Sequence, residues 1–157
     1  MKEKKAVSSS QVVMTQLVLP EHTNALNSIF GGTVMAWIDI CGAIASQRHS
    51  GMDVVTASID RLNFIAPVRL GWVVNLKASV NYTSRTSMEV GIRVDAENPK
   101  TGEVFHTASA YMTFVALGSD GRPAVIPGLL LENETEKRRF AAAEKRRQQL
   151  LASKNNQ

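Results

Sequence analysis

Residues 29–48 read IFGGTVMAWIDICGAIASQR and contain one charged side chain, Asp39, before Arg48. From Thr33 to Arg48 the segment has no proline and is mostly apolar, which predicts a buried helix about 24 Å long. Gly31 and Gly32 precede it, and glycine lets a backbone approach a ligand closely. The first N–H groups of a helix lack intrahelical acceptors and lie at its positive end, which suits an anion or an oxyanion. A plain turn into the helix is the alternative.

Asp39 lies in the middle of this apolar helix, where an ionised carboxylate needs a partner or a chemical role. At about 100° per residue, small residues lie beside it and bulky ones on the other side. The small ones are Ala36, Gly42, Ala43 and Ser46; the bulky ones are Trp37, Ile40 and Ile44. We expect room for a ligand on the small side and packing on a sheet on the bulky side. Cys41, about 160° from Asp39, is expected in the core. Pairing of Asp39 with an arginine, or capping of a neighbouring backbone group, remains the alternative.

Around the helix the pattern changes to the two-residue alternation that is typical of strands. Strands are expected over residues 11–19, 54–64, 72–82, 88–96 and 103–117. One helix set apart from a run of strands predicts an α+β domain, in which the helix packs on one face of an antiparallel sheet of about five strands.

The two ends of the chain differ from this body in charge. Of the net charge of +4, residues 1–5 contribute 3 − 1 = +2, residues 132–157 contribute 7 − 4 = +3, and the body 8 − 9 = −1. Residues 1–10 are expected to be flexible, residues 11–128 to form the domain, and residues 129–157 to form a basic helical tail opened by a capping box. A nucleic-acid-binding domain normally bears its basic stripe on the fold itself, so this distribution argues against nucleic acid.

Composition narrows the class of protein further. The 157 residues suit one domain. One cysteine and three scattered histidines provide no metal-ligand spacing, so no metal site is expected. No apolar run approaches the roughly 20 residues of a membrane-spanning helix, and no apolar signal core follows the N-terminus. We therefore expect a cytoplasmic protein without membrane insertion.

The residues around the helix resemble a known family in several places. The matching stretches are His22–Gly32, Met35–Asp39, Val54–Ala57, Asn63–Val68 and Tyr82–Val90. They are similar to the acyl-CoA thioesterases of the hotdog fold, over about residues 10–128. The resemblance implies a long central helix wrapped by a curved sheet. It also implies a homodimer in which two sheets join, with active sites at the interface, commonly assembled as a trimer of dimers.

The same resemblance implies roles for particular residues. A loop asparagine and a helix carboxylate form the catalytic pair from different subunits of the family, and they correspond to Asn24 and Asp39. Whether Asp39 acts as general base or nucleophile stays open, because either activates the attack on a thioester. The expected oxyanion donors are backbone N–H groups of Gly31, Gly32 and Thr33. Coenzyme A, which is part of the substrate and not a cofactor, is expected at Asn63, Ser84, Arg85, Thr86 and Ser87.

Three other functions remain open at this point. A non-catalytic acyl-CoA sensor is possible because a fold does not determine a function. A nucleic-acid module would use the basic clusters at residues 137–139 and 145–147. A hotdog dehydratase would be expected to have a catalytic histidine on or before the helix, a pattern that His22 does not match well.

Overall fold

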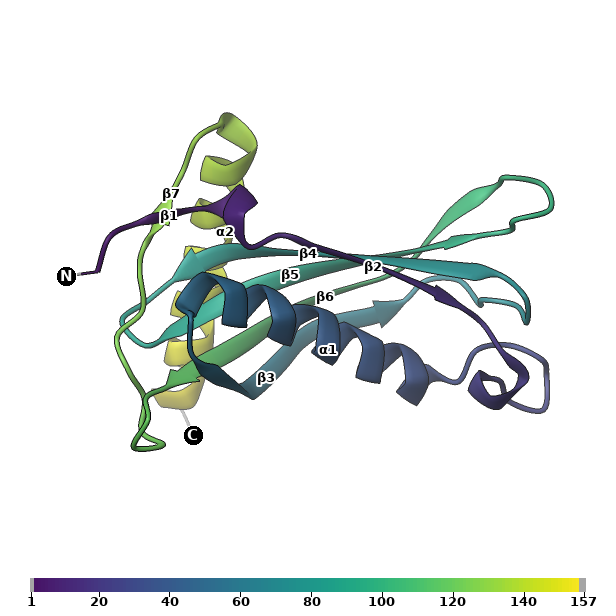
Figure 1. Ribbon diagram of the computed structural model, residues 1–157, viewed down its shortest axis with the longest axis horizontal. Coiled ribbons are helices and arrows are strands. Elements are labelled where there is room, and N and C mark those ends of the chain that lie inside the picture. The colour runs from purple at the N-terminus through teal and green to yellow at the C-terminus, as the bar shows by residue number, and fades with distance from the viewer. Residues whose placement is uncertain (1, 156–157) are drawn as a thin grey trace.

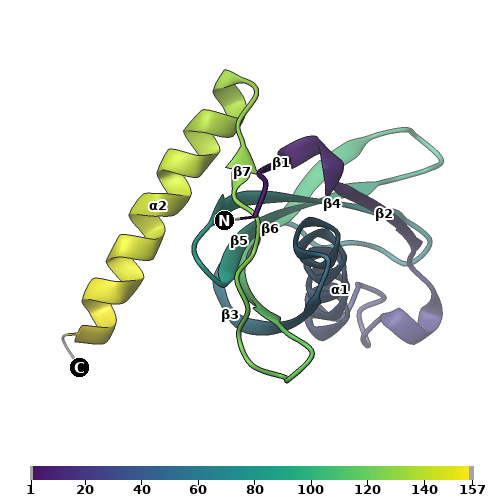
Figure 2. The ribbon, with the colours of Figure 1, turned by 60° about the vertical axis from the view of Figure 1, so that its left-hand side comes forward.

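Helix α1 (Gly31–Ser50) lies against a five-stranded antiparallel sheet that curves around it (Figures 1 and 2). This is a computed structural model, and it describes residues 2–155. The strand order is β2 (Val12–Leu17), β4 (Val73–Thr83), β5 (Ser87–Glu97), β6 (Val104–Leu117) and β3 (Asp53–Phe64). The predicted α+β fold with one central helix and about five strands is confirmed.

Helix α1 packs on the sheet through a stripe at helical spacing. Val34, Ile38, Cys41 and Ala45 are fully buried, at positions i, i+4, i+7 and i+11. The position of Cys41 in the core is therefore confirmed, and its burial raises the pKa of the thiol to about 11. The helix ends at Gly51, whose φ of 68° is readily adopted by glycine.

The predicted orientation of the helix was wrong in part. Ile40, expected to pack on the sheet, is 50% exposed, whereas Gly42 and Ser46 are buried. A Cβ atom at Gly42 would lie only 2.9 Å from the Phe114 ring. The absence of a side chain at this position therefore lets the helix approach the sheet closely. Small residues thus mark the tightest contact between helix and sheet, and bulky Ile40 remains outside it.

The segments at the two ends of the chain pack against the domain. The sequence predicted a flexible segment over residues 1–10, whereas β1 (Lys5–Ala6) pairs in parallel with β7 (Leu129–Leu130). Two short 3-10 helices, η1 (Val7–Ser9) and η2 (Pro20–His22), flank β2, and Val7 is buried. This strand pair, the hydrogen bond from Lys5 N–H to the Gly128 carbonyl and the buried Val7 attach residues 5–9 to the domain.

Helix α2 (Glu134–Asn155) lies on the face of the sheet opposite α1 (Figure 2). Its few apolar contacts include Phe140, whose ring centroid lies 4.8 Å from that of Tyr82. Arg146 forms two hydrogen bonds with the Glu89 carboxylate, at 2.7 and 3.0 Å, and its guanidinium lies over the Tyr111 ring. Arg146 and Phe140 thus attach a highly charged helix to the sheet. Within residues 2–155, no helix is long and apolar enough to cross a membrane.

Candidate active site

Asp39 is held by a residue from the neighbouring edge strand. The hydroxyl of Thr56, on β3, donates a hydrogen bond to Asp39 Oδ1 at 2.6 Å. A hydroxyl–carboxylate bond of this length is charge-assisted and fixes the orientation of the carboxylate. In the described part of the chain no lysine or arginine forms a salt bridge with Asp39. The second carboxylate oxygen has no hydrogen-bond donor there.

Thr56 is the site residue that sequence reasoning missed. The alternation of β3 predicts on which face of the strand Thr56 lies, but not which residue of α1 it meets. That depends on how the helix crosses the sheet, to which the close contact between Gly42 and Phe114 contributes. The only available signal was the position of Thr56 in the Val54–Ala57 stretch.

Asn24 lies in the exposed loop between η2 and α1. Its Oδ1 accepts hydrogen bonds from the backbone N–H groups of Leu26 and Ser28, at 2.9 and 3.3 Å. The loop is closed by Asn27, whose φ of 56° is tolerated best by asparagine among non-glycine residues. The carbonyl of Asn24 is therefore fixed, and its amide nitrogen forms no hydrogen bond within the described residues and remains available to donate.

Within one chain, the side chains of Asn24 and Asp39 lie far apart. The Asn24 loop lies beside the start of α1, and Asp39 is the ninth residue of that helix, about 12 Å further along its axis (Figure 1). No hydrogen bond connects the two side chains within residues 2–155.

The start of α1 provides fewer oxyanion donors than expected. Thr33 N–H already donates to the Phe30 carbonyl at 3.0 Å. The N–H groups of Gly31 and Gly32 form no such bond in the described structure, and both residues are exposed. The geometry therefore leaves the two glycines, and not Thr33, with free donors.

The residues expected to bind coenzyme A fall into two groups. Ser87 pairs with Val115 on β6, whereas Asn63 pairs with Ser109, six residues away or about 20 Å along the strand. Within the hairpin, Ser84 Oγ and Ser87 Oγ are 2.7 Å apart, and Arg147 of α2 donates to Ser87 Oγ at 3.3 Å. One chain therefore presents the Ser84, Arg85, Thr86 and Ser87 loop and Asn63 as separate patches.

An uncovered apolar surface surrounds Asp39. We call it the α1–β3 face; it comprises Phe30, Met35, Ile40, Val55, Ile59 and Phe64, each 38% to 58% exposed. Strand β3 is also an edge of the sheet, with one side unpaired. An apolar patch beside an unpaired strand edge is typical of a surface that another chain covers.

His49 lies in the last turn of α1, where the sequence predicts a side chain that interacts with the negative end of the helix dipole. The structure buries it completely, with Nε2 2.8 Å from the Pro127 carbonyl oxygen. Burial lowers the pKa of this histidine, so the neutral form is favoured. No group of three metal-binding side chains occurs among the described residues.

The fold and the site described above are those of a known protein family. Residues 26–103 match the family model described as the thioesterase superfamily, and the chain belongs to that superfamily, whose hotdog fold it shows. It is 38% identical over 134 residues to the uncharacterized acyl-CoA thioester hydrolase YkhA of Bacillus subtilis. This match covers 85% of this chain and 78% of the relative.

Two solved structures are similar over almost the whole chain. One is an apo hexameric acyl-CoA thioesterase, with TM-score 0.91 and 38% identity, covering 94% of this chain and 95% of that one. The other is an acyl-CoA hydrolase of Staphylococcus aureus in complex with butyryl coenzyme A, coenzyme A and coenzyme A disulfide. Its TM-score is 0.86 at 34% identity, and the match covers 98% and 96% of the two chains. Single alanine variants of that enzyme, at an aspartate, a threonine and an asparagine, have also been solved.

Proposed function

We propose that this protein hydrolyses acyl-CoA to a free fatty acid and coenzyme A, with Asp39 as general base or nucleophile. The observation that supports this most directly is the carboxylate of Asp39, oriented by Thr56 on a surface open to a ligand. Among residues 2–155, no ion pair with Asp39 gives this carboxylate a structural role.

Sequence spacing in the Staphylococcus aureus enzyme supports the choice of residues. The asparagine and aspartate replaced in that enzyme are 15 positions apart, and the aspartate and threonine are 17 apart. Asn24, Asp39 and Thr56 show the same two spacings, 15 and 17. This equal spacing supports assigning the catalytic roles to Asn24, Asp39 and Thr56.

In the proposed reaction, Asp39 takes a proton from water while the water oxygen attacks the thioester carbonyl carbon. The carbonyl oxygen becomes an oxyanion, stabilised by the backbone N–H groups of the partner subunit's Gly31 and the partner subunit's Gly32, at the positive end of that helix. When the tetrahedral intermediate collapses, the carbon–sulfur bond breaks and the leaving thiolate receives the proton from Asp39. In the nucleophilic variant, Asp39 attacks directly and water then hydrolyses the anhydride. Neither route requires a cofactor beyond the coenzyme A of the substrate.

The site is proposed to form between two copies of the chain. Asn24 is separated from Asp39 within one chain, and a partner placed on the α1–β3 face brings the second copy's loop toward the carboxylate. The free amide of Asn24 then donates to the thioester or to the water. Assembly as a trimer of dimers is proposed from the hexameric structural neighbour. We propose that the enzyme acts in the cytoplasm, and that coenzyme A contacts the two patches at Asn63 and Ser84–Ser87.

The test is the release of free coenzyme A thiol from acyl-CoAs of increasing chain length by wild-type protein and Asp39→Asn. We expect rapid release by wild type and a loss of about 10²–10⁴-fold in the variant. Thr56→Val should lose about 10- to 100-fold, because it removes one hydrogen bond to a charged group. Asp53→Asn, an exposed carboxylate at the start of β3, is the matched control and should retain full activity.

Two outcomes would contradict the proposal. Unchanged turnover in Asp39→Asn would remove this residue from the mechanism. Tight binding of acyl-CoA without turnover by wild-type protein at any chain length would favour a non-catalytic sensor.

A further inference from the structure

His22 is the last residue of η2 and directly precedes the loop that carries Asn24. Leu19 N–H donates a hydrogen bond to His22 Nδ1 at 3.0 Å, and the backbone N–H of His22 donates to the Leu19 carbonyl at 2.9 Å. These two bonds close η2 from both directions. Because the Leu19 N–H group is a donor, Nδ1 is the acceptor and the proton of the neutral ring is on Nε2. The mechanism proposed above does not use this side chain.

The ring of His22 also contacts α1. Its centroid lies 5.1 Å from that of Trp37, and the two planes meet at 78°, the edge-to-face arrangement that aromatic rings favour. Trp37 is only 8% exposed and belongs to the core. The imidazole is thus held on one side by η2 and on the other by a core residue, which fixes the position of Nδ1.

The backbone of His22 links the two groups that the proposed reaction needs from this end of α1. Its carbonyl accepts a hydrogen bond from Phe30 N–H at 2.8 Å, and Phe30 immediately precedes Gly31. Asn24 follows His22 by two residues. One residue therefore connects the loop asparagine with the free N–H groups at the start of α1.

The half of the loop that carries Asn24 has few attachments other than His22. The second half, residues 27–29, forms backbone hydrogen bonds with residues 68–70. In the first half Leu26 is 77% exposed, and the side-chain hydrogen bonds of Asn24 stay within the loop. A segment with exposed side chains and little apolar burial opens easily unless hydrogen bonds hold it. The position of Asn24 therefore depends on the bonds that His22 forms.

A proton on Nδ1 breaks this arrangement. A protonated imidazole donates from both ring nitrogens, so Nδ1 no longer accepts from a backbone N–H. The charged groups on the segments around the ring are Glu21 in η2 and Arg69, whose guanidinium donates to the Asn24 loop, and α1 meets the ring with the uncharged Trp37. Within residues 2–155, His22 forms no ion pair. Protonation therefore releases η2 without an ion pair that compensates for the lost bond.

We infer that His22 is a positioning residue of the thioesterase site. With Nδ1 unprotonated, it holds Asn24 and the N–H groups of Gly31 and Gly32 in the arrangement that they present to the partner subunit's Asp39. This inference rests on the function proposed above. His22 contacts no reacting atom and acts on catalysis through the loop.

Three substitutions at His22 separate the acceptor from the ring. His22→Asn places its amide oxygen as many bonds from the backbone as Nδ1, His22→Gln places its amide one bond further away, and His22→Ala has no acceptor. All three remove the ring contact with Trp37, so differences among them report the hydrogen bond from Leu19. We expect His22→Ala and His22→Gln to lower kcat for acyl-CoA hydrolysis by about tenfold or more and to change KM by less than about threefold, because oxyanion donors act mainly in the transition state. His22→Asn should retain kcat within about threefold of wild type, since asparagine readily accepts from a nearby backbone N–H.

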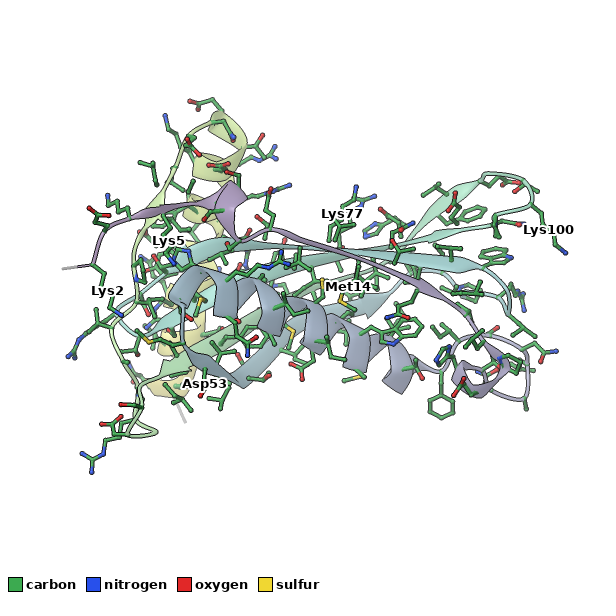
Figure 3. All side chains as sticks on the ribbon, viewed as in Figure 1. Lys2, Lys5, Met14, Asp53, Lys77 and Lys100 are labelled. Carbon is green, nitrogen blue, oxygen red and sulfur yellow. The ribbon has the colours of Figure 1, made fainter. Side chains whose placement is uncertain are left out.

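The pH dependence of kcat is a readout that a purely structural role would not change. Wild-type kcat should fall between about pH 8 and pH 5 as the imidazole gains a proton, and His22→Asn should lack this fall. Two matched controls should keep the wild-type turnover and pH profile. His106→Asn removes a partly buried histidine from β6, and Asp53→Asn removes a carboxylate at the opposite end of α1 from the Asn24 loop (Figure 3).

Hydrogen–deuterium exchange of residues 22–30 tests the same contact without the reaction. We expect faster exchange there in His22→Ala than in His22→Asn. Equal exchange in these two variants would overturn the inference, as would a loss of kcat in His22→Asn as large as in His22→Ala, or an acidic fall of the same size in His22→Asn and wild type. Absence of hydrolysis by wild-type protein would instead refute the proposed function, and the exchange measurement would still decide whether His22 holds the loop.

Discussion

Helices α1 and α2 lie on opposite faces of one sheet and are held there by different interactions. Helix α1 buries a continuous apolar stripe, and each fully buried aliphatic side chain contributes about 1.5–3 kcal/mol. In α2 the buried residues are Ala143 and Arg146 alone. Apolar burial stabilises a helix over its whole length, whereas an ion pair such as Arg146–Glu89 sets one position and register.

Within α1, one side of the helix stabilises the fold and the other side presents the candidate site. The buried side of this helix holds the fold together, and the uncovered side presents Asp39. On α2, the buried Arg146 pairs with Glu89, and Arg138 and Arg139 are exposed. In both helices, the residues available for chemistry are those that packing does not require.

The largest expected effect is on α1. Asp39→Ala should lower turnover by about 10²–10⁴-fold with little change in melting temperature, because the carboxylate is not part of the packed stripe. Ile38→Ala, the adjacent residue on the buried side, should lower the free energy of unfolding by about 2–5 kcal/mol. Thermal denaturation of both variants measures the effect on stability, and steady-state kinetics measures the effect on turnover. Similar destabilisation by the two changes would contradict it.

The next effect is on α2. Arg146→Ala leaves the Glu89 carboxylate without its partner, and loss of one member of a buried pair costs about 3–5 kcal/mol. We expect faster hydrogen–deuterium exchange throughout residues 134–155, with the exchange of α1 unchanged. Lys145→Ala, an exposed neighbour, serves as control. Full protection of α2 in Arg146→Ala would show that apolar contacts hold this helix.

A smaller effect tests how closely α1 approaches the sheet. Gly42→Ala should lower the free energy of unfolding by about 1–3 kcal/mol, since its Cβ would lie 2.9 Å from Phe114. At Gly32 the nearest atom to such a Cβ is 3.7 Å away, so Gly32→Ala should leave stability unchanged or raise it. Chemical denaturation measures both, and an equal response at the two glycines would refute the role of the close contact.

The smallest effect concerns pH and the end of α1. Burial lowers the pKa of His49 below the value of 6.5 that it has when unfolded, so the unfolded chain binds the additional proton. The stability that neutral His49 contributes is present above pH 6.5 and is lost as the pH falls below that value. Urea denaturation between about pH 7.5 and pH 5 should show a smaller loss of stability in His49→Gln than in wild type. An equal slope in both proteins would exclude His49 as the cause.

The same difference between the two helices explains which features of the fold and of the site could be predicted from the sequence. The periodicity of apolar residues and the positions of proline predicted the ends of α1 and of the five long strands to within two residues. They could do so because apolar periodicity reflects burial directly. The side of α1 that faces the sheet was predicted only in part: Cys41 is in the core as expected, but the burial of Gly42 could not be derived because glycine has no hydrophobic signal. The register that brings Thr56 to Asp39, and the docking of α2 by Arg146, depend on contacts between distant residues. The choice of Asn24 and Asp39 came from the resemblance together with the isolated carboxylate, and it remains a proposal.

The parallel pairing of β1 with β7 has a consequence for synthesis of the chain. Lys5 pairs with Leu129, so a strand made at the outset finds its partner 124 residues later. At about 5–20 residues per second, the ribosome needs roughly 6–25 seconds to supply that partner. During this interval the first strand has no neighbour, and contacts of such long sequence separation form slowly. Lys5 and Ala6 therefore cannot form their strand pair until residues 129 and 130 have been made.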